Sequence, residues 1–155
     1  MIMLVDGPSG SGKTTLATRL GILLRLPVIH MDDFYPGWSG LAAGSDIIAA
    51  SVLKTTDPGY YRWDWANDRA GEWVPVPPGA KIIEGAGAVT AETLRAASIS
   101  DHQVAAIMLT GEATTRYRRA MQRDPYYEPY WEMWAEQEKR HYAVQSQGLG
   151  DLVPT

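Results

Sequence analysis

Cysteine is absent from this sequence of 155 residues. The chain therefore cannot form disulfides or thiolate metal sites, and its composition fits a reducing compartment. The sequence also has no apolar run long enough to cross a bilayer. Its first apolar run, residues 1–5, is too short for the core of a signal peptide and ends at an aspartate. We therefore expect a cytoplasmic protein with no membrane association.

The chain has no excess of positive charge, because its formal net charge at pH 7 is −4. Nucleic-acid binding usually requires a basic surface, so we expect no nucleic-acid partner. A local cluster of cationic residues suits a small polyanion better, and it consists of Arg116, Arg118, Arg119 and Arg123. Repeats, low-complexity segments and linkers are also missing. The length is typical of one domain, which we expect to span residues 1–155.

Short apolar runs alternate with stretches of helical periodicity. We expect strands at about 1–5, 28–31, 80–84 and 104–109, and helices at about 13–25, 45–53, 90–97, 112–123 and 129–147. Ser45 and Thr90 are candidate N-caps, and Pro129 suits a first helical turn. This alternation predicts an α/β fold, a doubly wound parallel sheet with helices on both faces.

Two stretches break the alternation. Residues 34–44 contain Pro36, Gly37, Gly40 and Gly44, and we expect a loop there. Residues 60–78 contain several aromatic residues but no aliphatic periodicity, and they favour a hairpin or an ordered insertion. The aromatic residues of these two stretches could stack on a planar or sugar ring or could form a small core, and they include Tyr35, Trp38, Trp63 and Trp65.

A glycine-rich segment between the first expected strand and helix matches the phosphate-loop pattern G-x-x-x-x-G-K-[ST] at every fixed position. Glycine lets backbone N–H groups turn inward around a phosphate, and the following helix directs its positive dipole end at the anion. Lys13, which we also expect to be catalytic, would contact the β- and γ-phosphates, and the Thr14 hydroxyl would ligate Mg²⁺. The nucleotide-binding residues expected here are Gly7, Ser9, Gly10, Ser11, Gly12, Lys13, Thr14 and Thr15.

Carboxylates follow two other expected strands. Asp32 and Asp33 come after the second strand, and Glu84 ends the third. Ligands of open parallel sheets bind at the carboxyl ends of the strands. A carboxylate there can accept a proton from an attacking hydroxyl or support Mg²⁺. The alternatives are a loop or capping aspartate and a structural buried glutamate.

Three arginines at spacings of three and four share one face of the expected helix 112–123, namely Arg116, Arg119 and Arg123. Such guanidinium groups could cover the γ-phosphate and stabilise charge during transfer. We expect residues 112–128 to form a lid, with Arg119 catalytic and Arg116 and Arg123 binding the nucleotide. A solvated basic face is the alternative.

Together these motifs resemble the uridine kinase and nicotinamide riboside kinase group. The phosphate loop, Asp32-Asp33-Phe34-Tyr35, Ile82-Ile83-Glu84-Gly85 and the arginine helix occur in the matching order. The resemblance implies five parallel strands, with Asp32 as general base, Tyr35 in the substrate pocket and Glu84 near metal or substrate. From the residues and the resemblance, Asp33 and Trp63 are further candidates for substrate binding.

The sequence therefore favours a kinase that uses ATP and Mg²⁺ to phosphorylate a hydroxyl of a nucleoside-like or other small metabolite. An ATP-binding module without transfer activity is the main alternative. A GTPase switch is a third: Asp68-Arg-Ala-Gly71 matches D-x-x-G, but no buried strand precedes it and no Asn-Lys-x-Asp element is present.

Overall fold

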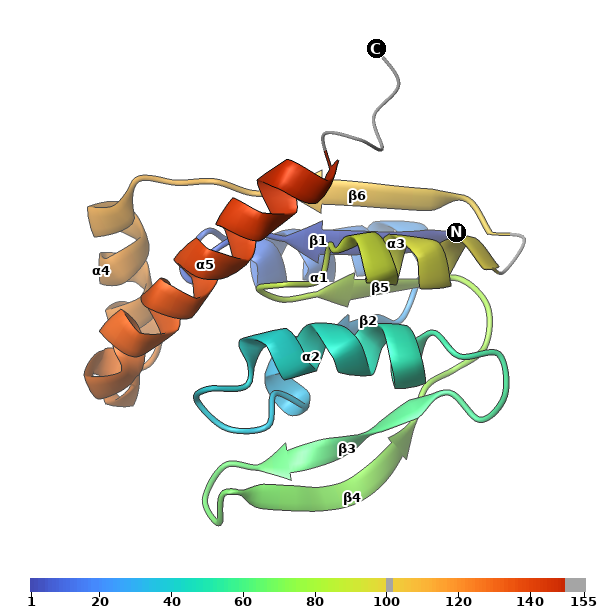
Figure 1. Cartoon of the computed structure of the whole chain (residues 1–155), viewed down its shortest axis with the longest axis horizontal. Helices are drawn as coiled ribbons and strands as arrows, with labels where there is room; N and C mark the ends of the chain where they lie inside the picture. The colour runs from blue at the N-terminus through green and yellow to red at the C-terminus, as the bar shows by residue number, and fades with distance from the viewer. Residues whose placement is uncertain (100–101, 150–155) are drawn as a thin grey trace.

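The computed structural model describes residues 1–99 and 102–149. Its centre is a parallel sheet in the order β2-β5-β1-β6, formed by β1 (Ile2–Asp6), β2 (Val28–His30), β5 (Lys81–Glu84) and β6 (Val104–Met108) (Figure 1). The expected α/β class is confirmed. Four of the five strands implied by the resemblance lie in the described ranges, and the C-terminal end, 151–155, lies outside them.

Helices cover both faces of this sheet. Side chains of β1 alternate between the faces, because successive residues of a strand point in opposite directions. Met3 and Val5 pack with Ala17 of α1 (Lys13–Leu24). Ile2 and Leu4 join the larger core on the opposite face, where α2 (Leu41–Ile47) and α3 (Ala91–Ile99) lie. Thr90 caps α3 as expected, since its Oγ1 accepts a hydrogen bond from the Thr93 amide.

The helix expected at 45–53 begins four residues earlier, at Leu41, and continues past Ile47 as the π-helical segment η2 (Ile48–Val52). The expectation that Ser45 caps it is wrong. Ser45 is buried inside α2, where its hydroxyl donates to the Leu41 and Gly87 carbonyls. Burial of Leu41 against the core explains the earlier start, because it outweighs the loop preference of the neighbouring glycines.

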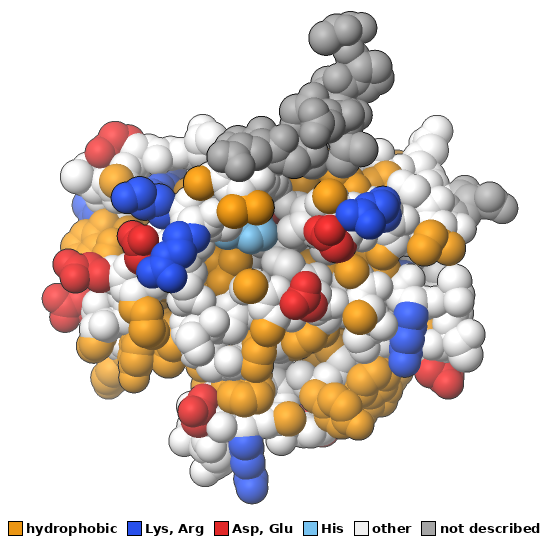
Figure 2. Space-filling model, viewed as in Figure 1, with side chains coloured by type: hydrophobic (Ala, Val, Ile, Leu, Met, Phe, Trp, Pro, Cys, Tyr) orange, Lys and Arg blue, Asp and Glu red, His pale blue; other side chains and the backbone are white. Residues whose placement is uncertain are grey.

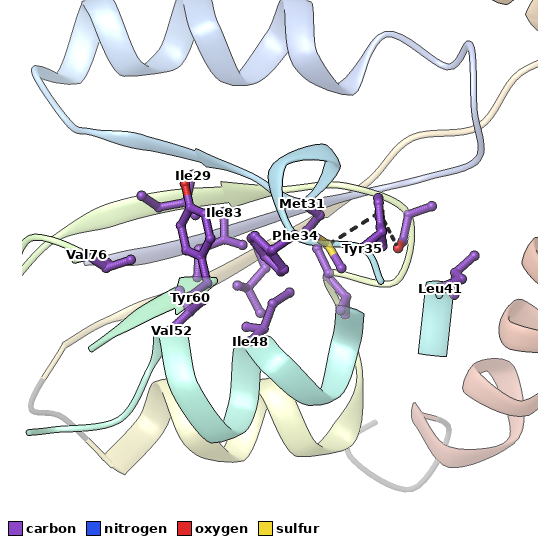
Figure 3. Close-up of a cluster of buried hydrophobic side chains, with 14 of the residues drawn as sticks. Ile29, Met31, Phe34, Tyr35, Leu41, Ile48, Val52, Tyr60, Val76 and Ile83 are labelled. Carbon is purple, nitrogen blue, oxygen red and sulfur yellow. Dashed lines mark hydrogen bonds between the residues drawn. The ribbon is translucent and has the colours of Figure 1, made fainter. Parts of the chain in front are cut away.

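The aromatic stretch forms an antiparallel hairpin of β3 (Gly59–Asp64) and β4 (Arg69–Pro75). Figure 3 shows how Tyr60 and Val76, at its base, enter the main core beside Ile29, Ile83 and Val52. The outer surface of the hairpin is exposed, and hydrophobic side chains gather over it at the lower edge of Figure 2. The D-x-x-G pattern, 68–71, lies in this hairpin, outside the parallel sheet.

The last third of the described chain forms α4 (Ala113–Arg123), the 3₁₀ segment η3 (Pro125–Tyr130) and α5 (Trp131–Leu149). Pro129 therefore lies just before the last helix, in η3, and not in its first turn. The long helix α5 runs across the carboxyl end of the sheet (Figure 1), where Tyr142 contacts Asp6 and Glu138 contacts Ser9. Within the described ranges, no helix is long and apolar enough to cross a membrane.

Candidate nucleotide and acceptor site

The phosphate loop connects β1 to α1, as its sequence predicts. Gly12 precedes α1 in the left-handed region, at φ 96°, which directs the first helical amides toward the loop centre. Gly10 also has a positive φ of 76°, and a Cβ there would overlap the backbone of Arg116. Glycine at position 10 therefore allows α4 to approach the loop as well as allowing the loop to turn.

Asp6, at the carboxyl end of β1, organises the backbone around this loop. Its carboxylate is fully buried and accepts hydrogen bonds from the amides of Gly7, Gly87 and Val89 and from the Tyr142 hydroxyl, at 2.6–2.9 Å. Each hydrogen bond to a buried carboxylate contributes more than a neutral one. Asp6 therefore ties the loop to the turn after β5 and to α5, and it does not line the cavity described next.

A cavity of about 320 Å³ lies over the loop at the carboxyl ends of the strands. Lys13, Asp32 and Glu84, which come from α1, the segment after β2 and the end of β5, all line it. The Lys13 ammonium donates to the Pro8 carbonyl at 3.2 Å. Burial lowers the pKa of Lys13, whereas the nearby carboxylates, Glu138 first, act to raise it. A cation thus faces carboxylates across one cavity.

Glu84 is buried and joins two neighbours. Its Oε1 lies 2.6 Å from His30 Nδ1 and accepts a hydrogen bond from the Thr14 hydroxyl at 3.1 Å. The hydrogen bond to Glu84 raises the pKa of His30 and favours imidazolium. Sequence reasoning did not identify His30, although it lies at the end of an expected strand. Its contact with Glu84 depends on the pairing of β2 with β5, which only the fold shows.

Asp32 and Asp33 face different surroundings. They belong to the 3₁₀ turn η1 (Met31–Asp33), and Asp32 lines the cavity. Desolvation raises the pKa of Asp32, with a further contribution from Glu84, while Lys13 opposes the shift. Asp33 instead accepts a hydrogen bond from the Tyr60 hydroxyl at 3.2 Å. It is not among the cavity-lining residues, so the structure places the expected substrate ligand Asp33 at the base of the hairpin.

The three arginines of α4 that were expected to bind or act on phosphate occupy three environments. Arg123 lines the cavity. Arg116 is held against the loop, because its guanidinium donates to the Ser9 carbonyl at 3.0 Å and to the Gly111 carbonyl at 3.1 Å. Arg119 is exposed and lies outside the cavity lining, because the buried side of α4 passes through Ala120. The shared helix face therefore does not bring all three guanidinium groups to one point.

Aromatic side chains form the other side of the cavity: Tyr35, Trp38, Trp65, Tyr127 and Trp134. Trp38 stacks on Tyr130 with ring centroids 4.0 Å apart and lies 5.0 Å from Trp65. Trp65 reaches the site from the hairpin turn, and its indole N–H donates to the Asp32 carbonyl at 3.0 Å. Trp63, expected to bind substrate, does not line the cavity.

Three other residues expected to bind substrate or nucleotide are Tyr35, Thr15 and Ser11. Tyr35 lines the cavity but is buried, and its hydroxyl is engaged in a hydrogen bond to the Ala86 carbonyl at 2.8 Å. Thr15 is exposed in the first turn of α1 and does not line the cavity. The Ser11 hydroxyl is buried and has no hydrogen-bond partner among the described residues.

The last helix supplies residues that sequence reasoning did not identify. Trp134 and Glu138 are four residues apart on α5, and Tyr142 follows four residues later. This spacing places them on one helix face, which contacts the aromatic side of the cavity, Ser9 and Asp6 in turn. The spacing of four was a usable signal, although only the fold shows what this face contacts.

The donor set near Thr14 fits a magnesium ion that also binds nucleotide. Within the described part of the chain, no group of three or more His, Asp or Glu side chains could hold a metal unaided. Mg²⁺ in phosphoryl-transfer sites needs fewer protein ligands, because phosphate oxygens and waters complete its octahedron. The Thr14 hydroxyl and the Glu84 carboxylate, which lie in direct contact, provide the oxygen ligands such an ion prefers.

Comparison with known proteins supports the fold. No protein-family model and no curated protein matches the sequence. Among solved structures, a possible uridine kinase from Bacillus stearothermophilus superposes with a TM-score of 0.52 at 21% identity, over 85% of this chain and 83% of the other. A gluconokinase from Sinorhizobium meliloti 1021 gives 0.52 at 14% identity, with 90% and 73% covered.

A third structure, an uncharacterized protein from Eubacterium ventriosum ATCC 27560, superposes with a TM-score of 0.50 at 13% identity, over 94% of this chain and 76% of the other. All three identities are low, so these likenesses concern the fold. The parallel sheet, its flanking helices and the loop between β1 and α1 together make this chain an α/β protein of the P-loop fold.

Proposed function

We propose that this protein is a kinase that transfers the γ-phosphate of ATP to a hydroxyl group of a small metabolite. One observation carries the proposal: the lysine of the phosphate loop and the carboxylate of Asp32 line the same cavity. Phosphoryl transfer needs a phosphate-binding group and a base for the acceptor hydroxyl within one site. A nucleotide-binding module without transfer chemistry does not require the second group.

The residues have separate roles in this mechanism. The loop amides and Lys13 hold the phosphates, and Arg123 neutralises charge from the lid side. A magnesium ion held by Thr14 and Glu84 would neutralise charge on the phosphate oxygens. Asp32 accepts the proton of the acceptor hydroxyl, and the oxygen of that hydroxyl bonds to the γ-phosphorus. The bond from that phosphorus to the bridging oxygen breaks, and ADP leaves.

The aromatic side of the cavity is suited to the acceptor. Aromatic rings pack against the flat faces of sugar and base rings, and the cavity, at about 320 Å³, lies at the lower end of the range for small-molecule sites. Trp65 and Trp134 flank this space from the hairpin and from α5. A nucleoside-like or other small ring-containing metabolite therefore fits the proposal best.

An acceptor panel tests the function. ADP production from ATP and Mg²⁺ should be slow in the absence of acceptor and should rise steeply with one member of a panel of nucleosides, neutral sugars and sugar acids. Mass spectrometry of the acceptor should show one added phosphoryl group. If ATP binds but no panel member raises turnover or gains phosphate, the binding-module alternative is favoured.

A further inference from the structure

Ser9 of the phosphate loop is held at three of its atoms by the last third of the chain. Its amide donates to Glu138 Oε1 at 2.7 Å, and its carbonyl accepts from Arg116 at 3.0 Å. Its hydroxyl accepts from the Tyr127 hydroxyl at 3.1 Å. The three partners come from α5, α4 and η3, so each of these elements contacts the same loop residue. The phosphate-transfer mechanism proposed above assigns no role to Glu138.

Glu138 places a buried carboxylate beside a loop suited to bind anions. Burial raises the pKa of Glu138, while the hydrogen bonds from Ser9 and the charges of Lys13 and Arg116 act to lower it. Only 3% of the residue is exposed. Its Oε2 lies 3.9 Å from the nearest Arg116 nitrogen, beyond hydrogen-bond distance, so the Ser9 amide is its close partner. Glu138 is also the carboxylate with the largest electrostatic effect on Lys13. Its charge therefore opposes the attraction of Lys13 for phosphate.

The position of Ser9 indicates which phosphate would meet this charge. Ser9 lines the cavity and contacts Tyr127, whose ring stacks on Trp38 of the aromatic side, the side proposed for the acceptor. The phosphate that approaches Ser9 is therefore the terminal one of a triphosphate. A diphosphate seated at the helix end of the loop, near Gly12 and Thr14, would stay farther from Glu138.

We propose that Glu138 is a specificity-determining residue that competes with the terminal phosphate for the Ser9 amide and so lowers the affinity for nucleoside triphosphates relative to diphosphates. The proposal rests on the proposed function only in requiring that the loop binds nucleotide. The carboxylate and the terminal phosphate are both negatively charged, and both can accept a hydrogen bond from the Ser9 amide. Removal of the carboxylate charge therefore favours the triphosphate selectively.

The test compares Glu138→Gln with wild type by isothermal titration calorimetry. The amide oxygen of glutamine can still accept from Ser9, so this change removes charge and keeps the hydrogen bond. We expect affinity for a non-hydrolysable ATP analogue with Mg²⁺ to rise roughly tenfold or more, and affinity for ADP to rise less than about threefold because of its distance from Glu138. Glu136→Gln, an exposed change on the same helix, should alter neither affinity.

The outcomes separate this proposal from the proposed function. Equal effects on both nucleotides, no effect, or weaker triphosphate binding in Glu138→Gln would each overturn the role of Glu138 while leaving the kinase proposal in place. Failure of the wild type to bind either nucleotide would overturn both. Lower turnover with unchanged affinities would identify a role in catalysis instead, and would likewise overturn the competition.

A measurement on the wild-type protein covers the case in which Glu138→Gln does not fold. The side-chain carboxyl carbon of Glu138 can be followed by NMR in protein labelled with ¹³C-glutamate. Its resonance can be assigned by elimination, using variants in which each of the other glutamates is replaced. Saturation with the ATP analogue should shift this resonance, because the carboxylate gives up the Ser9 amide, and ADP should shift it much less. An unchanged resonance in the presence of saturating analogue would contradict the competition.

Discussion

The two sides of the cavity are held together by different forces. On the phosphate side, directional hydrogen bonds link charged and polar groups, as in the chain from Thr14 through Glu84 to His30. On the aromatic side, the contacts are mainly between ring faces and edges, such as the parallel stack of Trp38 on Tyr130. Hydrogen bonds lose strength steeply when bent or stretched, whereas ring contacts tolerate several geometries.

The two sides also differ in where their residues come from. The phosphate side uses one continuous loop and the ends of adjacent strands, whose positions the sheet fixes. The aromatic side combines the loop before α2, the hairpin turn, η3 and α5, which meet chiefly through side chains. We infer that changes on the phosphate side disturb the reaction itself, whereas changes on the aromatic side alter which acceptor is used.

Lys13→Ala should produce the largest effect. Loss of the ammonium removes charge stabilisation from the transferred phosphate, and we expect turnover to fall about a hundredfold or more. The fold should remain, because the side chain contributes one hydrogen bond, to the Pro8 carbonyl, and little packing. Steady-state ADP release and thermal unfolding measure the two effects. Turnover like that of the wild type would contradict the kinase proposal.

Asp32→Asn should follow, with a loss of about a hundredfold in kcat, typical of removing a general base. ATP affinity should be kept, because the neutral amide cannot take the acceptor proton but does not disturb the loop. The matched change Asp33→Asn should be milder, since Asp33 contacts Tyr60 and does not line the cavity. The opposite order of the two losses would mean that Asp33 is the base.

The raised pKa of Asp32 gives this prediction a pH dependence. Only the ionised carboxylate can accept the acceptor proton, so kcat should fall as the pH decreases through a value above the ordinary aspartate pKa. The residual kcat of Asp32→Asn should not show this fall at low pH. The folded state also holds the Asp32 proton more tightly than the unfolded state, so Asp32→Asn should be more stable than wild type at pH 7. Denaturant unfolding at pH 7 and pH 4 should show this advantage shrinking at the lower pH.

Trp65→Ala addresses the aromatic side. Loss of the indole opens one wall of the cavity and removes the hydrogen bond to the Asp32 carbonyl. We expect the acceptor KM to rise about tenfold with little change in ATP affinity. Trp73→Ala is the control, because Trp73 belongs to the same hairpin but packs against Tyr61 away from the cavity. Equal effects of the two changes would mean that the hairpin acts only through its stability.

Tyr127→Phe should have the smallest effect and tests whether the two sides are coupled. It keeps the ring against Trp38 and removes the hydroxyl that donates to Ser9. A neutral hydrogen bond contributes about 1 kcal/mol, so nucleotide affinity should weaken by about fivefold. Tyr126→Phe, at an exposed neighbouring position, should leave affinity unchanged. An effect confined to the acceptor KM would indicate that Tyr127 serves only the aromatic side.

The phosphate side could be predicted from sequence because its information is local. The loop pattern lies within eight residues, and the carboxylates Asp32 and Glu84 come directly after short apolar runs in the sequence. Parallel strands bring their carboxyl ends to one edge, so order along the chain was enough to place these residues together. Local apolar periodicity likewise predicted the four described strands of the sheet.

The aromatic side and the α5 contacts depend on tertiary packing. Trp63 and Trp65 look equivalent in sequence, yet only Trp65 lines the cavity, because the hairpin places its turn at the site. Helical spacing put Arg119 on the same face as Arg116 and Arg123, but did not show how far that face is buried. Glu138 lies 129 residues from Ser9 in the sequence, and no local pattern predicts their hydrogen bond.

The exposed hairpin affects which substitutions this protein can tolerate. Its base is fixed in the core by Tyr60 and Val76, but most of β4 is exposed, so substitutions along it cost little folding stability. Its turn nevertheless delivers Trp65 to the acceptor side of the site. Under the proposed function, acceptor preference could therefore change through substitutions in the exposed hairpin without any change in the residues proposed to transfer phosphate.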